Sequence, residues 1–233
     1  MTRARITLVL AILLVGAGCD GLSTSPAADA TTTTVPVTTA ATTPTATTTP
    51  PTMPASPPAT LCNSYQDPVA TGTVAADWAT EISGIVASRA HPDVLWMHND
   101  SGGGPYVYAT TVTGDDMGTF EIDTTTFDWE DIAIGPGPDP ARYYLYLGDI
   151  GDNLHFRAYV TVQRFAEPEP DPAGGFISEV DEFNLYYSKP GQDAEAMFVD
   201  PVTGDLVLIA KPQSGGDAPI YRARVDLLVD GAR

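Results

Sequence analysis

A strand–strand–turn–strand pattern that occurs three times along the chain constrains the fold more than any other feature. Each copy opens on a glutamate followed by an apolar β-type run, and these runs are Glu81–Val86, Glu130–Gly135 and Glu195–Asp200. A second apolar run, a polar turn and a third run follow, and the third runs are Tyr106–Tyr108, Tyr159–Val162 and Ile220–Ala223. Helical periodicity is almost absent. The sequence therefore predicts an all-β domain.

The spacing of the repeats favours a β-propeller. The leading glutamates are about 50 and about 65 residues apart, and a four-stranded propeller blade takes about 40–50 residues. The Pro/Glu-rich loop Glu167–Pro172 and an added strand expected near Phe183–Tyr187 explain the longer interval. We therefore expect about three blades arranged as an open arc. A β-sandwich is the alternative.

Three blades are too few to close a propeller, which takes about four to eight. The third repeat ends near Leu228, so we interpret residues 61–233 as a propeller-like domain truncated at its C-terminus. Either further repeats in a longer protein or assembly with another copy is expected. Cys62 fits the same expectation, because it has no partner in the chain if Cys19 is lipidated.

Residues 1–18 have the pattern of an export signal. Arg3 and Arg5 precede an apolar run. A membrane-spanning helix needs about 20 apolar residues, and this run is shorter. The run ends on small residues directly before Cys19, which resembles the lipobox of bacterial lipoproteins, although Gly16 stands where Leu is usual. We therefore predict that Cys19 is lipidated and anchors the protein at the extracytoplasmic face of the cell membrane. The alternative is an ordinary signal peptide with an incidental cysteine.

Residues 19–60 comprise this cysteine and a tether rich in Thr and Pro. From Ser23 to Thr60 the only charged residue is Asp29 and no residue is aromatic. Such a segment cannot bury enough apolar surface to offset the entropy lost on folding, so we expect it to be disordered. Its prolines favour extended conformations, which would hold the domain away from the membrane.

The acidity of the domain excludes several classes of partner. The formal net charge is −19, and the leader and tether contribute as many bases as acids, so the excess lies in residues 61–233. Nucleic acids and anionic lipid surfaces both attract basic patches. We therefore expect no nucleic-acid partner, and membrane contact only through the N-terminal lipid. The charge is compatible with cation binding and equally with plain solubility.

Several acidic positions are candidates for a Ca²⁺ site. The glutamates that open the repeats would meet near the axis of a propeller, and Asp128 lies on the same strand face as Glu130. Convergent oxygen ligands are what Ca²⁺ requires, although the spacing is not that of an EF-hand. The alternative is that these side chains cap backbone N–H groups. The predicted metal ligands are Glu81, Asp128, Glu130, Asp149, Asp152, Asn153 and Glu195.

Three further residues, Asp100, Arg157 and Lys211, are candidates for binding a ligand. Arg157 and Lys211 would either hold an anionic group or pair with nearby carboxylates. No residue is predicted to be catalytic, because the Ser, His and Asp of the turn His98–Ser101 are chain neighbours and such neighbours seldom form a triad. The sequence contains no motif for a nucleotide or redox cofactor.

Five segments within roughly residues 80–225 read EISGI, LWMHNDSG, DWEDIA, LYLGDIGDN and AEAMFVDPVTGDLVLIAK. Together they resemble a group of exported bacterial, often actinobacterial, β-propeller proteins that are loosely similar to the phytase-like and SdiA-regulated-protein-like propellers. The resemblance implies a propeller fold without implying one activity. A module that binds a ligand or a surface protein is the first hypothesis. The alternative is a calcium-dependent phosphoester hydrolase of the phytase-like type, which the scarcity of Lys and Arg disfavours.

Overall fold

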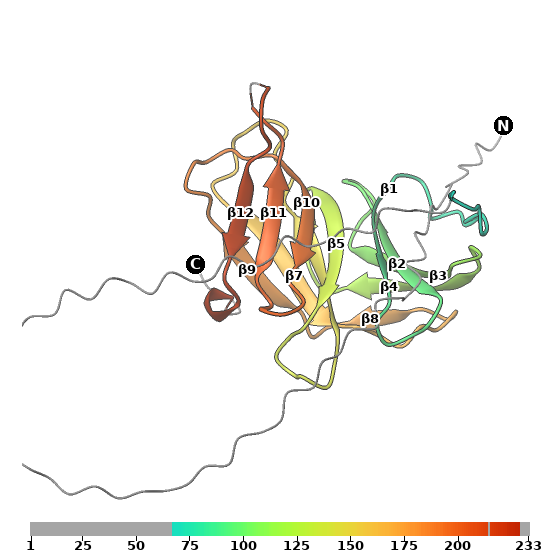
Figure 1. The fold of residues 1–233 in the computed structure, drawn as a ribbon. Coiled ribbons are helices and arrows are strands. Elements are labelled where there is room, and N and C mark those ends of the chain that lie inside the picture. The colour runs from blue at the N-terminus through green and yellow to red at the C-terminus, as the bar shows by residue number, and fades with distance from the viewer. Residues whose placement is uncertain (1–66, 214, 229–233) are drawn as a thin grey trace, which may run out of the picture. The chain divides into compact units, whose positions relative to one another are not determined.

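The structure, a computed structural model, describes residues 67–213 and 215–228 (Figure 1). These residues contain twelve β-strands and a single-turn 3-10 helix, η1 (Val225–Leu227). The strands form three sheets that, apart from one short strand, follow one another along the chain. The all-β prediction is confirmed. The alternative of a sandwich is wrong, because a sandwich has two sheets.

The first sheet is a four-stranded antiparallel meander with one added strand. Its order is β1 (Ile82–Ala87), β2 (Val94–Asn99), β3 (Tyr106–Thr111), β4 (Asp116–Ile122) and β8 (Gly175–Ile177). β8 pairs in parallel with β4. The Pro/Glu-rich loop Glu167–Pro172 therefore leads the chain from the second sheet back to the edge of the first.

The second and third sheets repeat the meander. The second contains β5 (Trp129–Gly135), β6 (Tyr144–Asp149), β7 (Val160–Ala166) and β9 (Asp181–Leu185), and the third contains β10 (Ala194–Val199), β11 (Leu206–Ala210) and β12 (Ile220–Ala223). The strand expected near Phe183–Tyr187 is β9, and it is the fourth strand of its sheet. β4, which the repeat pattern did not predict, holds the same place in the first sheet.

Two of the three clusters of buried apolar residues in the described part of the chain form layers on the second sheet, one on each face, and the third contains Val74, Leu95 and Met97. The layer toward the first sheet includes Trp96, Trp129, Leu145, Leu147 and Phe165. The layer toward the third sheet includes Tyr146, Val162, Phe183, Leu206 and Leu208. Side chains alternate between the two faces of a strand, so β7 supplies residues to both layers. The second sheet therefore carries an apolar layer on each face.

Two glycines allow the first strands of the three sheets to approach one another closely. β5 packs against both β1 and β10. A Cβ added to Gly84 of β1 would lie 2.7 Å from the backbone nitrogen of Ile132, and one added to Gly135 of β5 would lie 2.4 Å from Cγ1 of Val199. Both distances are well inside van der Waals contact. A side chain at either glycine would force neighbouring sheets apart.

Gly135→Ala is expected to lower the free energy of unfolding by about 1–3 kcal/mol, because the added methyl group overpacks the contact between β5 and β10. Urea unfolding measures this change. Gly148→Ala in β6 is the control. Its Cβ would lie 3.1 Å from Cδ1 of Ile150, and the end of that side chain can move aside. Equal destabilisation by the two substitutions would show that β5 and β10 leave room for a methyl group at Gly135.

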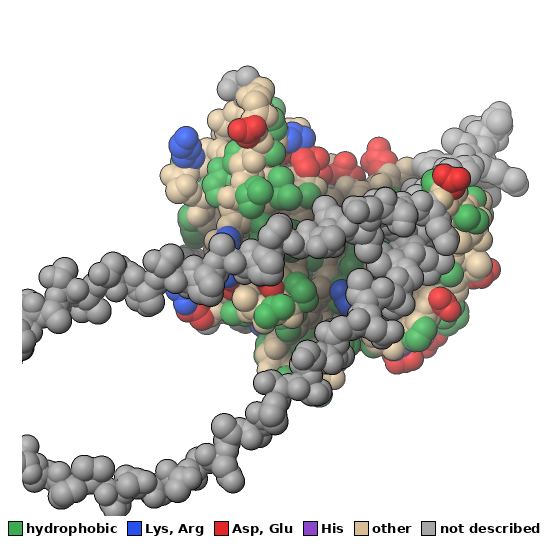
Figure 2. All heavy atoms as spheres, viewed as in Figure 1, with side chains coloured by type: hydrophobic (Ala, Val, Ile, Leu, Met, Phe, Trp, Pro, Cys, Tyr) green, Lys and Arg blue, Asp and Glu red, His purple; other side chains and the backbone are tan. Residues whose placement is uncertain are grey.

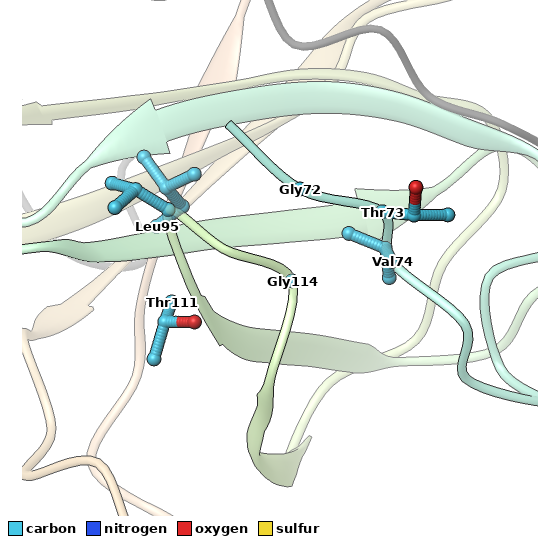
Figure 3. A pocket seen from close by; sticks show the side chains of 7 residues that line it. Gly72, Thr73, Val74, Leu95, Thr111 and Gly114 are labelled. Atoms are coloured by element: carbon cyan, nitrogen blue, oxygen red, sulfur yellow. The ribbon is translucent and has the colours of Figure 1, made fainter. Parts of the chain in front are cut away.

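The segment before β1 packs along the β3–β4 turn. Thr71 Oγ1 donates a hydrogen bond to the backbone oxygen of Val112 at 2.7 Å. A cavity of about 10 Å³ lies here, lined in part by Gly72, Leu95 and Gly114 (Figure 3). A space of this size holds at most about one water molecule, so it is not a ligand site.

The predicted export signal 1–18, Cys19, the tether 19–60 and Cys62 lie outside the described residues. Ala70 and the described residues after it belong to one compact unit. None of the helical structure within the described ranges is long and apolar enough to cross a membrane.

Candidate metal site

Five carboxylates gather near the beginning of β5 and β10. We call them the acidic cluster: Asp100, Asp128, Glu130, Asp193 and Glu195. They form two groups that share Glu130, one with Asp100 and Asp128 and the other with Asp193 and Glu195, and in each group carboxylate oxygens lie within 4.8 Å of one another. Figure 2 shows acidic side chains collected at the edge of the molecule, between the third sheet and the first. Such a set of oxygen ligands could hold a metal ion.

A β-bulge at the same place in each sheet positions the two glutamates of the cluster. The pairing of the first strand with the second skips one residue, which is Ser83 in β1, Glu130 in β5 and Glu195 in β10. A bulge leaves one residue unpaired and redirects its side chain. Glu130 and Glu195 are therefore structurally equivalent, and Ser83 is their counterpart in the first sheet.

The backbone hydrogen bonds correct the alignment of the repeats by two residues. The carbonyl oxygens of Glu81, Asp128 and Asp193 each accept a hydrogen bond from an N–H just beyond the second strand of their sheet. These three residues are therefore equivalent, whereas the sequence analysis aligned Glu81 with Glu130 and Glu195. Side chains on a strand repeat every two residues. A two-residue error thus leaves every apolar position on its correct face and cannot be detected from the pattern.

Glu81 does not belong to the acidic cluster. It is exposed, and its backbone N–H donates to Oδ1 of Asn99 at 3.2 Å. The bulge residue of the first sheet, Ser83, donates its hydroxyl to the backbone oxygen of Glu130 at 2.8 Å. In this sheet Asp100, at the start of the β2–β3 turn, supplies the carboxylate instead. Asp100 was predicted to bind a ligand, and the structure groups it with the candidate metal ligands.

Asp193 is the member of the cluster that the sequence analysis missed. It precedes Glu195 by two residues, as Asp128 precedes Glu130. This shared spacing was the signal that could have found it. Asp193 is only 3% exposed, and its Oδ1 accepts a hydrogen bond from the backbone N–H of Asp152 at 2.8 Å.

Glu130 has the most strongly perturbed carboxyl group of the cluster. The residue is 8% exposed. Burial, and then the carboxylates of Glu195, Asp100 and Asp128, raise the pKa of Glu130 from 4.5 to about 8, while Lys211 acts in the opposite direction. Burial also raises the pKa of Asp128, with Asp100 and Asp149 contributing. Full ionisation of the cluster near neutral pH is therefore unfavourable unless a cation compensates for it.

Lys211 compensates for one side of the cluster. Its Nζ lies 2.9 Å from Oδ2 of Asp193 and also pairs with Oε1 of Glu195. Hydrogen bonds to these two carboxylates raise the pKa of Lys211. Within residues 67–213 and 215–228, no basic side chain forms an ion pair with Asp100 or Asp128. That side of the cluster is where an added cation would gain most.

The acidic turn after β6 has a different role from the one predicted. Asp149 accepts hydrogen bonds from the backbone N–H groups of Phe127 and Asp128, at 2.8 and 3.1 Å, and pairs with Arg157 at 2.8 Å. Asp152 accepts from the N–H groups of Phe156 and Arg157, at 2.9 and 3.0 Å. Both carboxylates therefore cap backbone N–H groups, which is the alternative to metal binding given in the sequence analysis. Neither they nor Asn153, which is exposed, belongs to the two carboxylate groups.

Gly151 leaves the space in which two carboxylates of the cluster lie. A Cβ added there would be 2.3 Å from Oδ2 of Asp128 and 2.4 Å from Oε1 of Glu130. The backbone oxygen of Gly151 accepts a hydrogen bond from Arg157 Nη1 at 2.8 Å. The turn thus forms one wall of the cluster without contributing a carboxylate to it.

No protein-family model matches the chain, and a search of curated proteins finds no significant match. The chemistry of the acidic cluster is therefore the guide to its function.

Proposed function

We propose that the protein is an extracytoplasmic binding module, anchored to the membrane through lipidated Cys19, in which the acidic cluster binds a Ca²⁺ ion. The main support for the cation site is Glu130, which belongs to two groups of carboxylates. In each group, carboxylate oxygens lie within 4.8 Å of one another. Every side-chain ligand in these groups is a carboxylate oxygen, which suits Ca²⁺ better than Zn²⁺. Ca²⁺ also tolerates irregular geometry and completes its six to eight ligands with water and backbone oxygens.

We further propose that the three sheets are successive blades of a β-propeller. This is supported by the contacts of β5 with both β1 and β10, since the first strands of neighbouring blades lie side by side around the axis. The acidic cluster draws its ligands from the ends of β2, β5 and β10, hence from all three sheets. A cation bound there would tie the sheets together and relieve the repulsion between their carboxylates.

Titration calorimetry of the chelator-treated protein tests the cation site. We expect Ca²⁺ to bind to the unmodified protein and to bind at least tenfold more weakly to Glu130→Gln, which removes the shared ligand but keeps its shape. Glu179→Gln is the matched control, because Glu179 is an exposed acid outside the cluster, and it should bind as the unmodified protein does. Absence of Ca²⁺ binding, or equal binding by Glu130→Gln, would contradict the proposal.

The alternative of a phosphoester hydrolase is disfavoured by the basic residues beside the cluster. Arg157 is held by Asp149 and Gly151, and Lys211 by Asp193 and Glu195. A phosphate would have to break these contacts before either side chain could hold it. We expect no Ca²⁺-dependent hydrolysis of p-nitrophenyl phosphate. Hydrolysis that requires Ca²⁺ and is lost in Glu130→Gln would favour the enzyme instead.

A further inference from the structure

A second candidate site lies outside the acidic cluster, in an open groove on the second sheet that we call the lateral groove. It is defined by Thr125–Phe127, Asp149, Phe156–Tyr159, Thr161, Gln163, Glu182 and Asn184. Its volume is about 630 Å³, within the range of sites that hold small molecules. The β4–β5 and β6–β7 connections form its walls, and β7 and β9 form its floor.

The floor of the lateral groove is a patch of polar side chains. Thr161 of β7 pairs with Asn184 of β9, and Gln163 pairs with Glu182, so all four side chains stand on one face of the sheet. The Thr161 hydroxyl donates to Oδ1 of Asn184 at 3.2 Å. Gln163 is 1% exposed, and its Oε1 has no hydrogen-bond partner within the described residues. A buried amide oxygen of this kind calls for a donor.

The walls present aromatic rings to solvent. Phe127 is 59% exposed and Phe156 is 62% exposed, and their rings meet edge to face with 6.0 Å between centroids. The guanidinium of Arg157 lies 5.0 Å from the centre of the Phe127 ring. Since Asp149 and the Gly151 carbonyl hold Arg157 in turn, the Phe127 ring is fixed in place. Because the two rings are nearly perpendicular, a flat apolar ligand face can stack on only one of them, and Phe156 is the more exposed.

The charges in the lateral groove disfavour an anionic ligand. Arg157 and Asp149 neutralise each other, and their side chains are only 11% and 4% exposed. Oε1 of Glu182 accepts a hydrogen bond from the Thr124 hydroxyl at 2.5 Å. Besides the Glu182 carboxylate, the groove presents hydroxyl and amide groups beside aromatic faces. The groove also lies on the face of β7 and β9, where a peptide could not add itself to a strand edge.

We propose that the lateral groove binds a neutral saccharide. The ring hydroxyls of a sugar both donate and accept hydrogen bonds, which matches Gln163, Thr161 and Asn184. Its apolar C–H face would pack on the exposed Phe156 ring. The inference rests on the proposed function in that it gives the binding module a class of ligand, but it uses none of the carboxylates of the acidic cluster.

The test is binding of the full chain to an array of neutral gluco-, manno-, galacto- and arabino-oligosaccharides, followed by calorimetry with the best-bound trisaccharide. Phe156→Ala should weaken binding at least tenfold without unfolding the protein, because the ring is exposed. Phe176→Ala, which removes a 61% exposed ring on β8 outside the groove, should bind as the unmodified protein does.

Glu130→Gln separates this inference from the cation site, and it should lose Ca²⁺ binding while saccharide binding stays within twofold. Failure of every oligosaccharide to bind would overturn the saccharide proposal and leave the cation site standing. Unchanged binding in Phe156→Ala would also overturn it, as would preferential binding of a peptide library to the groove.

Discussion

Trp96→Ala is expected to lower the free energy of unfolding by about 3–5 kcal/mol, the range for removing a large buried aromatic side chain. Trp96 in β2 is 0% exposed and packs edge to face on Phe120, with 5.5 Å between ring centroids. Its Nε1 donates to Oε1 of Glu167 at 2.9 Å, and the same carboxylate accepts from Ser88 and from the N–H of Ala90. Because Glu167 follows the third strand of the second sheet, the substitution weakens the junction of two sheets as well as the core.

Denaturant unfolding followed by tryptophan fluorescence and circular dichroism measures this loss. Phe176→Ala is the control, since it removes an aromatic ring that is already 61% exposed, and it should change stability by less than about 0.5 kcal/mol. Trp96→Phe keeps most of the buried surface and should cost less than Trp96→Ala. A change below about 1 kcal/mol for Trp96→Ala would mean that this layer of the core is misplaced.

In the presence of chelator, the melting temperature is expected to fall as the pH rises from about 6.5 to about 8. The raised pKa of Glu130, from 4.5 to about 8, means that the folded protein keeps a proton that the unfolded chain has released in this window. Stability therefore decreases as the pH rises through it. Asp128 acts in the same direction. The lowered pKa values of Asp115, Asp200 and Asp205 have the opposite sign, but their effect falls below 3.8. Burial also lowers the pKa of His98 from 6.5, and its opposing effect falls below 6.5, again outside this window.

Glu130→Gln should remove most of this pH dependence, because the amide does not titrate, and Glu179→Gln should keep it. Saturating Ca²⁺ should flatten the profile of the unmodified protein, since the cation favours the ionised carboxylates. The measurement is differential scanning calorimetry at constant ionic strength. A melting temperature that rises between pH 6.5 and 8 with chelator present would show that Glu130 is not buried among carboxylates.

The strands that contain continuous apolar runs were predictable from the sequence, and those that lack them were missed. The apolar runs Val94–Met97 and Tyr144–Leu147 lie within β2 and β6, and the all-β class follows from them. β4 has the sequence DMGTFEI, with a glycine and two acids, and β8 has only three residues. Such strands owe their place to pairing with a neighbour and not to their own pattern. This is why the fourth strand of the first sheet was overlooked.

The candidate metal site was predictable in part. Glu130, Glu195 and Asp128 were identified as acids at the start of inner strands, and all three belong to the acidic cluster. Glu81 was misaligned by two residues, because side chains repeat every two residues along a strand and such an error leaves the alternation unchanged. Asp149 and Asp152 turned inward to cap backbone groups. Whether an acid coordinates or caps depends on which N–H groups the fold brings near it, and that is a property of the assembled sheets.

The melting temperature with and without Ca²⁺ at pH 8, for the unmodified protein and for Gly151→Ala, tests the cation site most directly. The alanine methyl group would enter the space of the Asp128 and Glu130 carboxylates while leaving every charge in place. At a Ca²⁺ concentration about 100 times the dissociation constant, binding stabilises the folded state by about 2.7 kcal/mol, which corresponds to about 5–10 °C for a domain of this size. We predict this shift for the unmodified protein and its loss in Gly151→Ala. The same melting temperature in Ca²⁺ and in chelator for the unmodified protein, or an equal shift in both proteins, would contradict the account.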